Sequence, residues 1–168
     1  LESSPEDTEG KRALAMCRVR LGDMAFLGGD LETASEHHGA AADALEQLDD
    51  ITGDDDSARD FAVAMNAYAG TLGAAGQVER ATTMYARGLE AREALAARHP
   101  DDKRTQRDLS VQHLRVGGRL NDAGQYEAAL ESFERAIRVR ERLAESDPSS
   151  GRARRDLAFA QYFAGSSL

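Results

Sequence analysis

The sequence predicts an all-α array of antiparallel helix pairs that repeats about every 48 residues. One register consists of Arg59-Asp60-Phe61, Arg107-Asp108-Leu109 and Arg155-Asp156-Leu157, which recur at intervals of 48. A second register is formed by Gly29, Gly76 and Gly124. The composition agrees, because alanine, leucine, arginine and glutamate favour helices and proline occurs only 3 times. A repeat at a fixed period is the signature of a stacked helical array.

The glycine register divides each repeat into two helices, since glycine readily adopts the left-handed backbone found just after a helix. We therefore expect helix pairs over 12–28 with 31–49, 59–75 with 78–98 and 104–123 with 126–146, and a lone helix over 153–168. The joints at 49–57, 99–103 and 146–151 are rich in Asp, Ser, Gly and Pro and are expected to be loops.

The predicted domain organisation is simple. Residues 1–10 form a flexible acidic tail, and 11–168 form a single array with repeats at 12–49, 59–98 and 104–146 and a partial repeat at 153–168. Small residues at Gly22, Ala69 and Gly117 mark the places where the first helix of each pair is expected to lie closest to its neighbour.

The third repeat resembles the tetratricopeptide repeat (TPR) family. The residues that carry the resemblance are Val116-Gly117, Leu120, Tyr126, Ala129, Leu130, Phe133 and Ala136. The resemblance is to a long-period, bacterial-type variant, about 14 residues longer than the usual 34, as two extra turns on each of two helices would produce. It implies a right-handed superhelical solenoid with three full pairs plus one terminal helix. It also implies that His38 and His113 occupy core positions.

Composition and motifs argue against several classes of function. The formal charge is −9 and arginines alternate with acids, so we expect no nucleic-acid partner. There is no run of 18 apolar residues, and Cys17 is the only cysteine, so we expect no membrane partner and a cytoplasmic location. The sequence contains no HExxH, GxSxG or phosphate-loop motif. We therefore expect no catalytic residue, no metal, no cofactor and no enzyme.

A binding groove is predicted on the first helix of each pair, as the resemblance implies. Its residues recur at spacings of three and four along each helix, which places them on one face. They are Val19, Asp23, Phe26, Asn66, Gly70, Val111, Arg115, Gly118 and Asn121. This groove suits a protein or peptide segment with aliphatic side chains. Alternatively, these residues coat an inner surface that binds nothing.

Three aromatic residues cluster on the unpaired last helix: Phe159, Tyr162 and Phe163. We expect them to contact a partner or a second copy of the chain, giving a possible homo-oligomer; alternatively they are simply left exposed. The predicted function is a non-catalytic interaction or scaffolding module. The alternative is a peptide-sensing regulatory domain of a larger signalling protein, which an attached helix-turn-helix or catalytic domain would favour.

Overall fold

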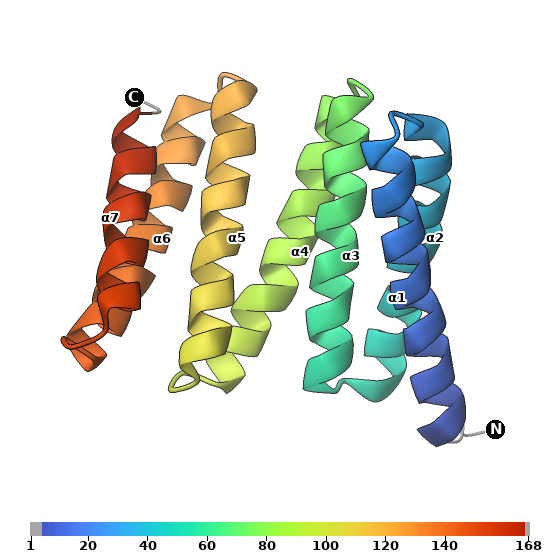
Figure 1. Ribbon diagram of the computed structural model, residues 1–168, viewed down its shortest axis with the longest axis horizontal. Helices are drawn as coiled ribbons and strands as arrows, with labels where there is room; N and C mark the ends of the chain where they lie inside the picture. Colours follow the sequence, from blue (N-terminus) through green and yellow to red (C-terminus); the bar gives the residue numbers. More distant parts are fainter. Residues whose placement is uncertain (1–4, 167–168) are drawn as a thin grey trace. The chain divides into compact units, whose positions relative to one another are not determined.

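The residues that the computed structural model describes, 5–166, form seven α-helices and no strand (Figure 1). The helices are α1 (Pro5–Leu27), α2 (Leu31–Thr52), α3 (Asp55–Ala74), α4 (Val78–Arg98), α5 (Lys103–Asp122), α6 (Tyr126–Ser146) and α7 (Gly151–Ser166). The predicted all-α fold of helix pairs is confirmed. None of the described helices is long and apolar enough to cross a membrane.

The structure differs from the prediction in where the first helix begins and in how the chain divides into compact units. The helix α1 begins at Pro5, so residues 5–10 of the predicted tail are helical, and residues 1–4 lie outside the described part. Proline suits the first helical turn, and Asp7 adds an ion pair of 2.7 Å to Lys11 one turn later. In place of one array, the chain divides into two compact units, Leu1–Ala91 and Arg92–Leu168.

The predicted loop at 49–57 is also shorter than expected. Only Gly53 and Asp54 separate α2 from α3. Gly53 has φ 58° and donates its N–H to Asp49, which closes α2. Asp54 then caps α3 by accepting a hydrogen bond of 2.7 Å from the Ser57 N–H. Two adjacent caps thus replace a loop, because each helix end finds its hydrogen-bond partner locally.

The turn glycines behave as predicted. Gly29, Gly76 and Gly124 have φ values of 81°, 76° and 74°, a region that L-residues with a side chain rarely adopt. Each ends the first helix of a pair and allows the second helix to start two residues later. The glycine register therefore sets where each pair folds back on itself.

In the first unit, the core is built from α1, α2 and α3. Its buried residues are mostly alanine and leucine: Ala15, Val19, Ala41, Ala42, Leu45, Leu48, Phe61, Ala64 and Met65. Gly22 is needed for the approach of α1 to α2, because a Cβ there would lie 2.3 Å from the ring of His38. His38 is buried, as predicted, and its ring nitrogens contact Thr71 Oγ1 at 2.8 Å and the Val19 carbonyl at 3.2 Å.

In the second unit, the core lies among α5, α6 and α7. Its buried residues are Leu114, Ala129, Phe133, Ala136, Ala160 and Ala164. Gly117 allows α5 to approach α6 as Gly22 allows α1 to approach α2, because a Cβ at Gly117 would lie 2.5 Å from the Phe133 ring. The predicted close approach of the first helix is thus confirmed at two repeats, and in both cases an aromatic ring of the second helix fills the space.

Candidate binding site

The structure places the predicted groove residues in different environments. Val19 and Asn66 are buried, with 4% and 8% of their surface exposed, and Val19 belongs to the core of the first unit. Their assignment to an open groove is therefore corrected: these side chains hold the fold together. On the same unit Asp23 and Phe26 are exposed, and Gly70 is half-buried.

The remaining groove residues lie on α5 in the second unit. Val111 and Arg115 are exposed, whereas Gly118 and Asn121 are half-buried. Arg115 forms no ion pair or side-chain hydrogen bond within the described part of the chain. An exposed, unpaired guanidinium beside an exposed valine is compatible with binding, but the four residues line none of the cavities described below.

The aromatic residues of α7 divide into two kinds. Phe159 and Tyr162 are exposed, at 56% and 74%. Phe163 instead packs edge-on against Phe133 of α6, with ring centroids 5.6 Å apart, and stacks on Phe159 at 5.9 Å. Phe163 therefore attaches α7 to its own unit, and only the other two rings offer most of their surface to a partner.

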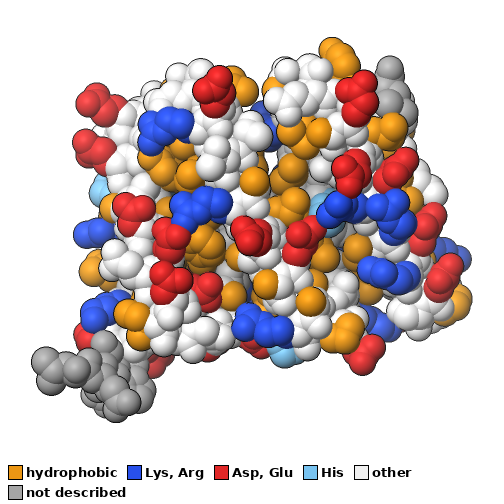
Figure 2. Space-filling view, turned by 180° about the vertical axis from the view of Figure 1, so that it is seen from behind, with side chains coloured by type: hydrophobic (Ala, Val, Ile, Leu, Met, Phe, Trp, Pro, Cys, Tyr) orange, Lys and Arg blue, Asp and Glu red, His pale blue; other side chains and the backbone are white. Residues whose placement is uncertain are grey.

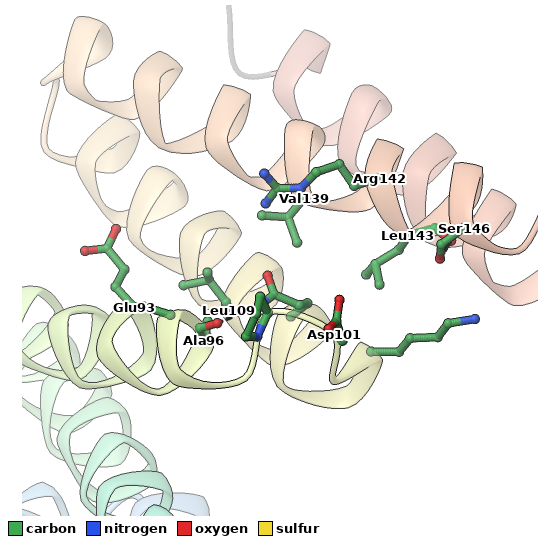
Figure 3. A pocket seen from close by; sticks show the side chains of 12 residues that line it. Glu93, Ala96, Asp101, Leu109, Val139, Arg142, Leu143 and Ser146 are labelled. Atoms are coloured by element: carbon green, nitrogen blue, oxygen red, sulfur yellow. Dashed lines mark hydrogen bonds between the residues drawn. The ribbon is translucent and has the colours of Figure 1, made fainter.

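A cavity of about 680 Å³ lies within the second unit, where the end of α4 meets α5 and α6. Its lining residues are Glu93, Ala96, Ala97, Pro100, Asp101, Lys103, Gln106, Leu109, Val139, Arg142, Leu143 and Ser146. Figure 3 shows Val139 and Leu143 extending from α6 towards the side formed by Ala96 and Leu109. We call this space the α4–α6 cavity.

Hydrogen bonds fix the wall formed by α4 and α5. The Gln106 side-chain amide donates to the carbonyls of Ala96 at 2.8 Å and His99 at 3.2 Å, which ties the end of α4 to α5. Asp102 caps α5 by accepting from the N–H groups of Arg104 and Thr105. The cavity is thus largely formed before any ligand arrives, which reduces the cost of binding.

The edge of the α4–α6 cavity carries both signs of charge. Glu93 and Asp101 are acidic, and Lys103 and Arg142 are basic. Arg135 contacts Glu93 at 3.2 Å. On the face drawn in Figure 2, acidic and basic side chains are likewise interspersed, with hydrophobic side chains between them. Mixed charges around an apolar centre can orient a bound segment without making the site specific for one sign.

His113 lies buried behind Glu93, at 3.7 Å between Nε2 and the carboxylate. Its Nδ1 has no hydrogen-bond partner in the described part of the chain. Burial and, to a smaller extent, the charges of Arg135 and Arg138 together lower the pKa of the imidazole from 6.5 to about 4. His113 is therefore neutral at pH 7, as expected for the packing histidine that the sequence predicted.

Two aspartates of the Arg-Asp register, Asp60 and Asp156, form ion pairs with an arginine of the preceding first helix. Arg12 of α1 contacts Asp60 of α3 at 3.9 Å, and Arg107 of α5 contacts Asp156 of α7 at 2.7 Å. In both cases an arginine reaches the aspartate 48 or 49 residues later, on the first helix of the next repeat. Burial raises the pKa of Asp60 above its ordinary value, while the charge of Arg12 opposes the shift.

Sequence reasoning missed the residues of the α4–α6 cavity. One signal was available: Pro100 lies in the four-residue joint between α4 and α5, where a proline prevents either helix from continuing and leaves neighbouring side chains partly uncovered. The lining residues of α6 carry no comparable mark, because Val139 and Leu143 look like ordinary core positions of an amphipathic helix.

Comparison with known proteins agrees with this architecture. Residues 115–149 match the family model described as "Tetratricopeptide repeat". This segment covers the part of α5 from Arg115 onward and all of α6, the pair in which Gly117 meets Phe133. The chain is therefore a TPR-like helical repeat, and repeats of this type generally mediate protein–protein interaction. No curated protein matches the sequence.

Among the solved structures that match the chain are a filament and a designed helical repeat protein. The structure described as "DHF58 filament" is 19% identical to this chain with a TM-score of 0.43; the match covers 96% of this chain and 82% of the DHF58 chain. The de novo designed helical repeat protein DHR64 is 19% identical with a TM-score of 0.42, and covers 98% of this chain and 84% of its own. Similarity at this level carries no information on function.

Proposed function

We propose that this chain is a non-catalytic protein-binding module that holds a segment with aliphatic side chains in the α4–α6 cavity. The observation that supports the proposal is a space of about 680 Å³ whose lining is apolar at the centre and charged at the edge. Such a volume falls in the usual range of about 300 to 1,000 Å³ for ligand pockets. Tetratricopeptide-type repeats generally bind proteins, which makes a protein segment the first candidate.

The lining favours aliphatic over aromatic or polar side chains. Leu109 and Val139 are nearly buried, and Leu143 is half-buried, so an incoming methyl or methylene group finds apolar neighbours on the sides of α5 and α6. Burying one aliphatic side chain there would contribute about 1.5 to 3 kcal/mol. Arg142 can bind a carboxylate of the segment near the edge and Asp101 can bind a base, whereas Lys103 and Glu93 already pair with Asp147 and Arg135.

A pair of variants tests the proposal. Ala97 is exposed and lines the cavity, so Ala97→Arg fills the space without entering the core. Ala94 lies one turn earlier on α4, is equally exposed and does not line the cavity. Ala94→Arg therefore adds the same side chain and charge outside the site.

The experiment selects peptides from a displayed random library on the wild-type protein and measures their affinities by fluorescence polarisation. We expect the selected peptides to share aliphatic residues, to bind Ala97→Arg about tenfold more weakly, and to bind Ala94→Arg within twofold of wild type. Failure to select any peptide, or equal affinities for the two variants, contradicts the proposal. Circular dichroism of both variants checks that the helices persist.

The predicted groove on the first helices remains a second, narrower proposal. It is supported by the exposed pair Val111 and Arg115, the latter without an ion pair in the described residues. A selected peptide whose affinity falls in Arg115→Ala but not in Ala97→Arg would favour this face. The sensor alternative, the cytoplasmic location, and the absence of nucleic-acid and membrane partners stay predictions from the sequence.

A further inference from the structure

A second cavity of about 450 Å³ lies in the second unit among α5, α6 and α7. Its lining residues are Lys103, Arg104, Arg107, Asp108, Arg140, Leu143, Asp147, Ser150, Arg152, Ala153 and Asp156. Five of these are basic and three are acidic, so the lining carries a formal charge of +2, in a chain whose total is −9. We call it the arginine cavity.

Each aspartate of the arginine cavity already has a basic partner. Asp147 lies 3.6 Å from Lys103, and Asp156 lies 2.7 Å from Arg107. Asp108 lies 3.7 Å from Arg92, which does not line the cavity.

Three guanidinium groups remain, and they come from three different helices: Arg104 on α5, Arg140 on α6 and Arg152 on α7. None of the three forms an ion pair with a carboxylate in the part of the chain that the structure describes.

Arg140 is a lining residue of this cavity whose side chain is buried and held in place by hydrogen bonds. Only 4% of its surface is exposed, yet it lines the space. Its Nε donates to Ser110 Oγ at 3.0 Å, its Nη1 donates to the Asp156 carbonyl, and its guanidinium lies 6.0 Å from the centre of the Phe159 ring. Its Nη2 makes no hydrogen bond to the described residues.

A buried arginine held in this way is costly unless its charge is compensated. Ser110 and the Asp156 carbonyl orient the guanidinium but bring no carboxylate to Nη2. The N-terminal ends of α5 and α7 also begin at this cavity, at Lys103 and Gly151, and the positive ends of their dipoles add to the same potential. The site is therefore prepared for an anion with several acceptor oxygens.

We propose that the arginine cavity binds a phosphate monoester group. A phosphate monoester carries about −1.5 to −2 charges at pH 7 and three strong acceptor oxygens, which matches the formal charge of the lining and three guanidinium donors. Planar guanidinium groups bind such oxygens with two parallel hydrogen bonds. The ester group would lie towards Leu143 and Ala153, the apolar lining residues.

The two cavities share Lys103 and Leu143, but Ala97 lines only the α4–α6 cavity and Arg152 only the arginine cavity, so variants at these two positions test the two proposals separately. The phosphate group could belong to a phosphorylated side chain of a protein or to a small phosphorylated molecule. Both present the same chemistry to the three arginines, and the probes below distinguish them.

The test is calorimetric titration of the full chain with O-phosphoserine, with a capped phosphoserine pentapeptide flanked by alanines, and with the same peptide without phosphate. We expect saturable binding of the phosphorylated probes only. Tighter binding of the peptide than of O-phosphoserine identifies a protein source, and equal or weaker binding identifies a small molecule.

Matched variants locate the site. Arg104→Gln and Arg152→Gln each remove one unpaired charge and should weaken binding about tenfold. Arg154→Gln removes the same charge from an exposed position of α7 outside the cavity and should stay within twofold of wild type. Absence of saturable binding, or equal weakening in all three variants, overturns the proposal. Thermal midpoints of the variants check that α7 remains folded.

Discussion

The substitution His113→Met should make the stability of this protein less sensitive to acid. Met65 occupies the corresponding position one repeat earlier and is buried in the first unit with 1% exposure, so methionine suits this place in the repeat. The change removes an imidazole whose Nδ1 has no partner in the described residues. It introduces a flexible apolar side chain that adapts to the space available.

The expected magnitude follows from the pKa of His113, which burial lowers from 6.5 to about 4. Below pH 6.5 the unfolded chain binds a proton that the folded chain does not, so stability falls as the pH drops towards 4 and then levels off. The linkage relation gives a loss of about 2 kcal/mol between pH 7 and pH 5. The loss is specific to the wild type, because methionine does not titrate.

Urea unfolding of both proteins, followed by circular dichroism at pH 7 and at pH 5, measures this difference. The carboxylates titrate in both proteins, so their contribution cancels in the comparison. We expect the wild type to lose about 2 kcal/mol more than His113→Met over this range. Equal losses, or a proton NMR titration of the His113 ring with a midpoint near its ordinary value, would refute the reasoning.

Three further substitutions test the packing and one helix cap. Gly117→Ala should destabilise by about 1 to 3 kcal/mol, because its Cβ would lie 2.5 Å from Phe133. Gly118→Ala meets its nearest neighbour at 3.6 Å and should stabilise by up to about 1 kcal/mol; thermal midpoints in the opposite order would contradict this. Asp54→Ala removes the cap on the Ser57 N–H and should cost about 1 kcal/mol in urea unfolding. That hydrogen bond lowers the pKa of Asp54, so the difference should persist at neutral pH and shrink as the carboxylate is protonated in acid; a constant difference would contradict this.

The sequence was sufficient to predict where the helices turn. Gly29, Gly76 and Gly124 each need a backbone that other residues avoid, so their positions can be read without knowing what they pack against. It was not sufficient to predict the start of α1 or the two-residue joint at Gly53 and Asp54. Both depend on local caps and ion pairs that compete with loop conformations by only about 1 kcal/mol.

The groove prediction failed at Val19 and Asn66 for a different reason. A helix in a stacked array buries one face against the partner in its own pair and another against the next repeat, and both faces recur at three and four residues. Spacing alone therefore cannot distinguish a face that meets a neighbouring helix from one left open. The structure decides this for α1, where the Val19 carbonyl faces His38 of α2 and its side chain lies in the core.

The Arg-Asp register identified the repeat correctly from the sequence, but only the structure shows which contacts its residues make. Its spacing of 48 identified the repeat, and the contacts Arg12 to Asp60 and Arg107 to Asp156 show that two of its aspartates pair with an arginine of the preceding first helix. Partly exposed ion pairs of this kind contribute at most about 1 kcal/mol, less than the burial of one leucine. Their effect is therefore mainly on the alignment of neighbouring helices, because a shift by one helical turn would keep many apolar contacts but separate Arg12 from Asp60 and Arg107 from Asp156. In the second unit this same pairing holds the Asp156 carboxylate at Arg107, so Arg140 bonds to the main-chain carbonyl of Asp156, while the carboxylate charge still opposes the fall in the pKa of Arg140 that burial causes. The interaction between successive first helices thus also leaves the Arg140 guanidinium without a carboxylate hydrogen bond.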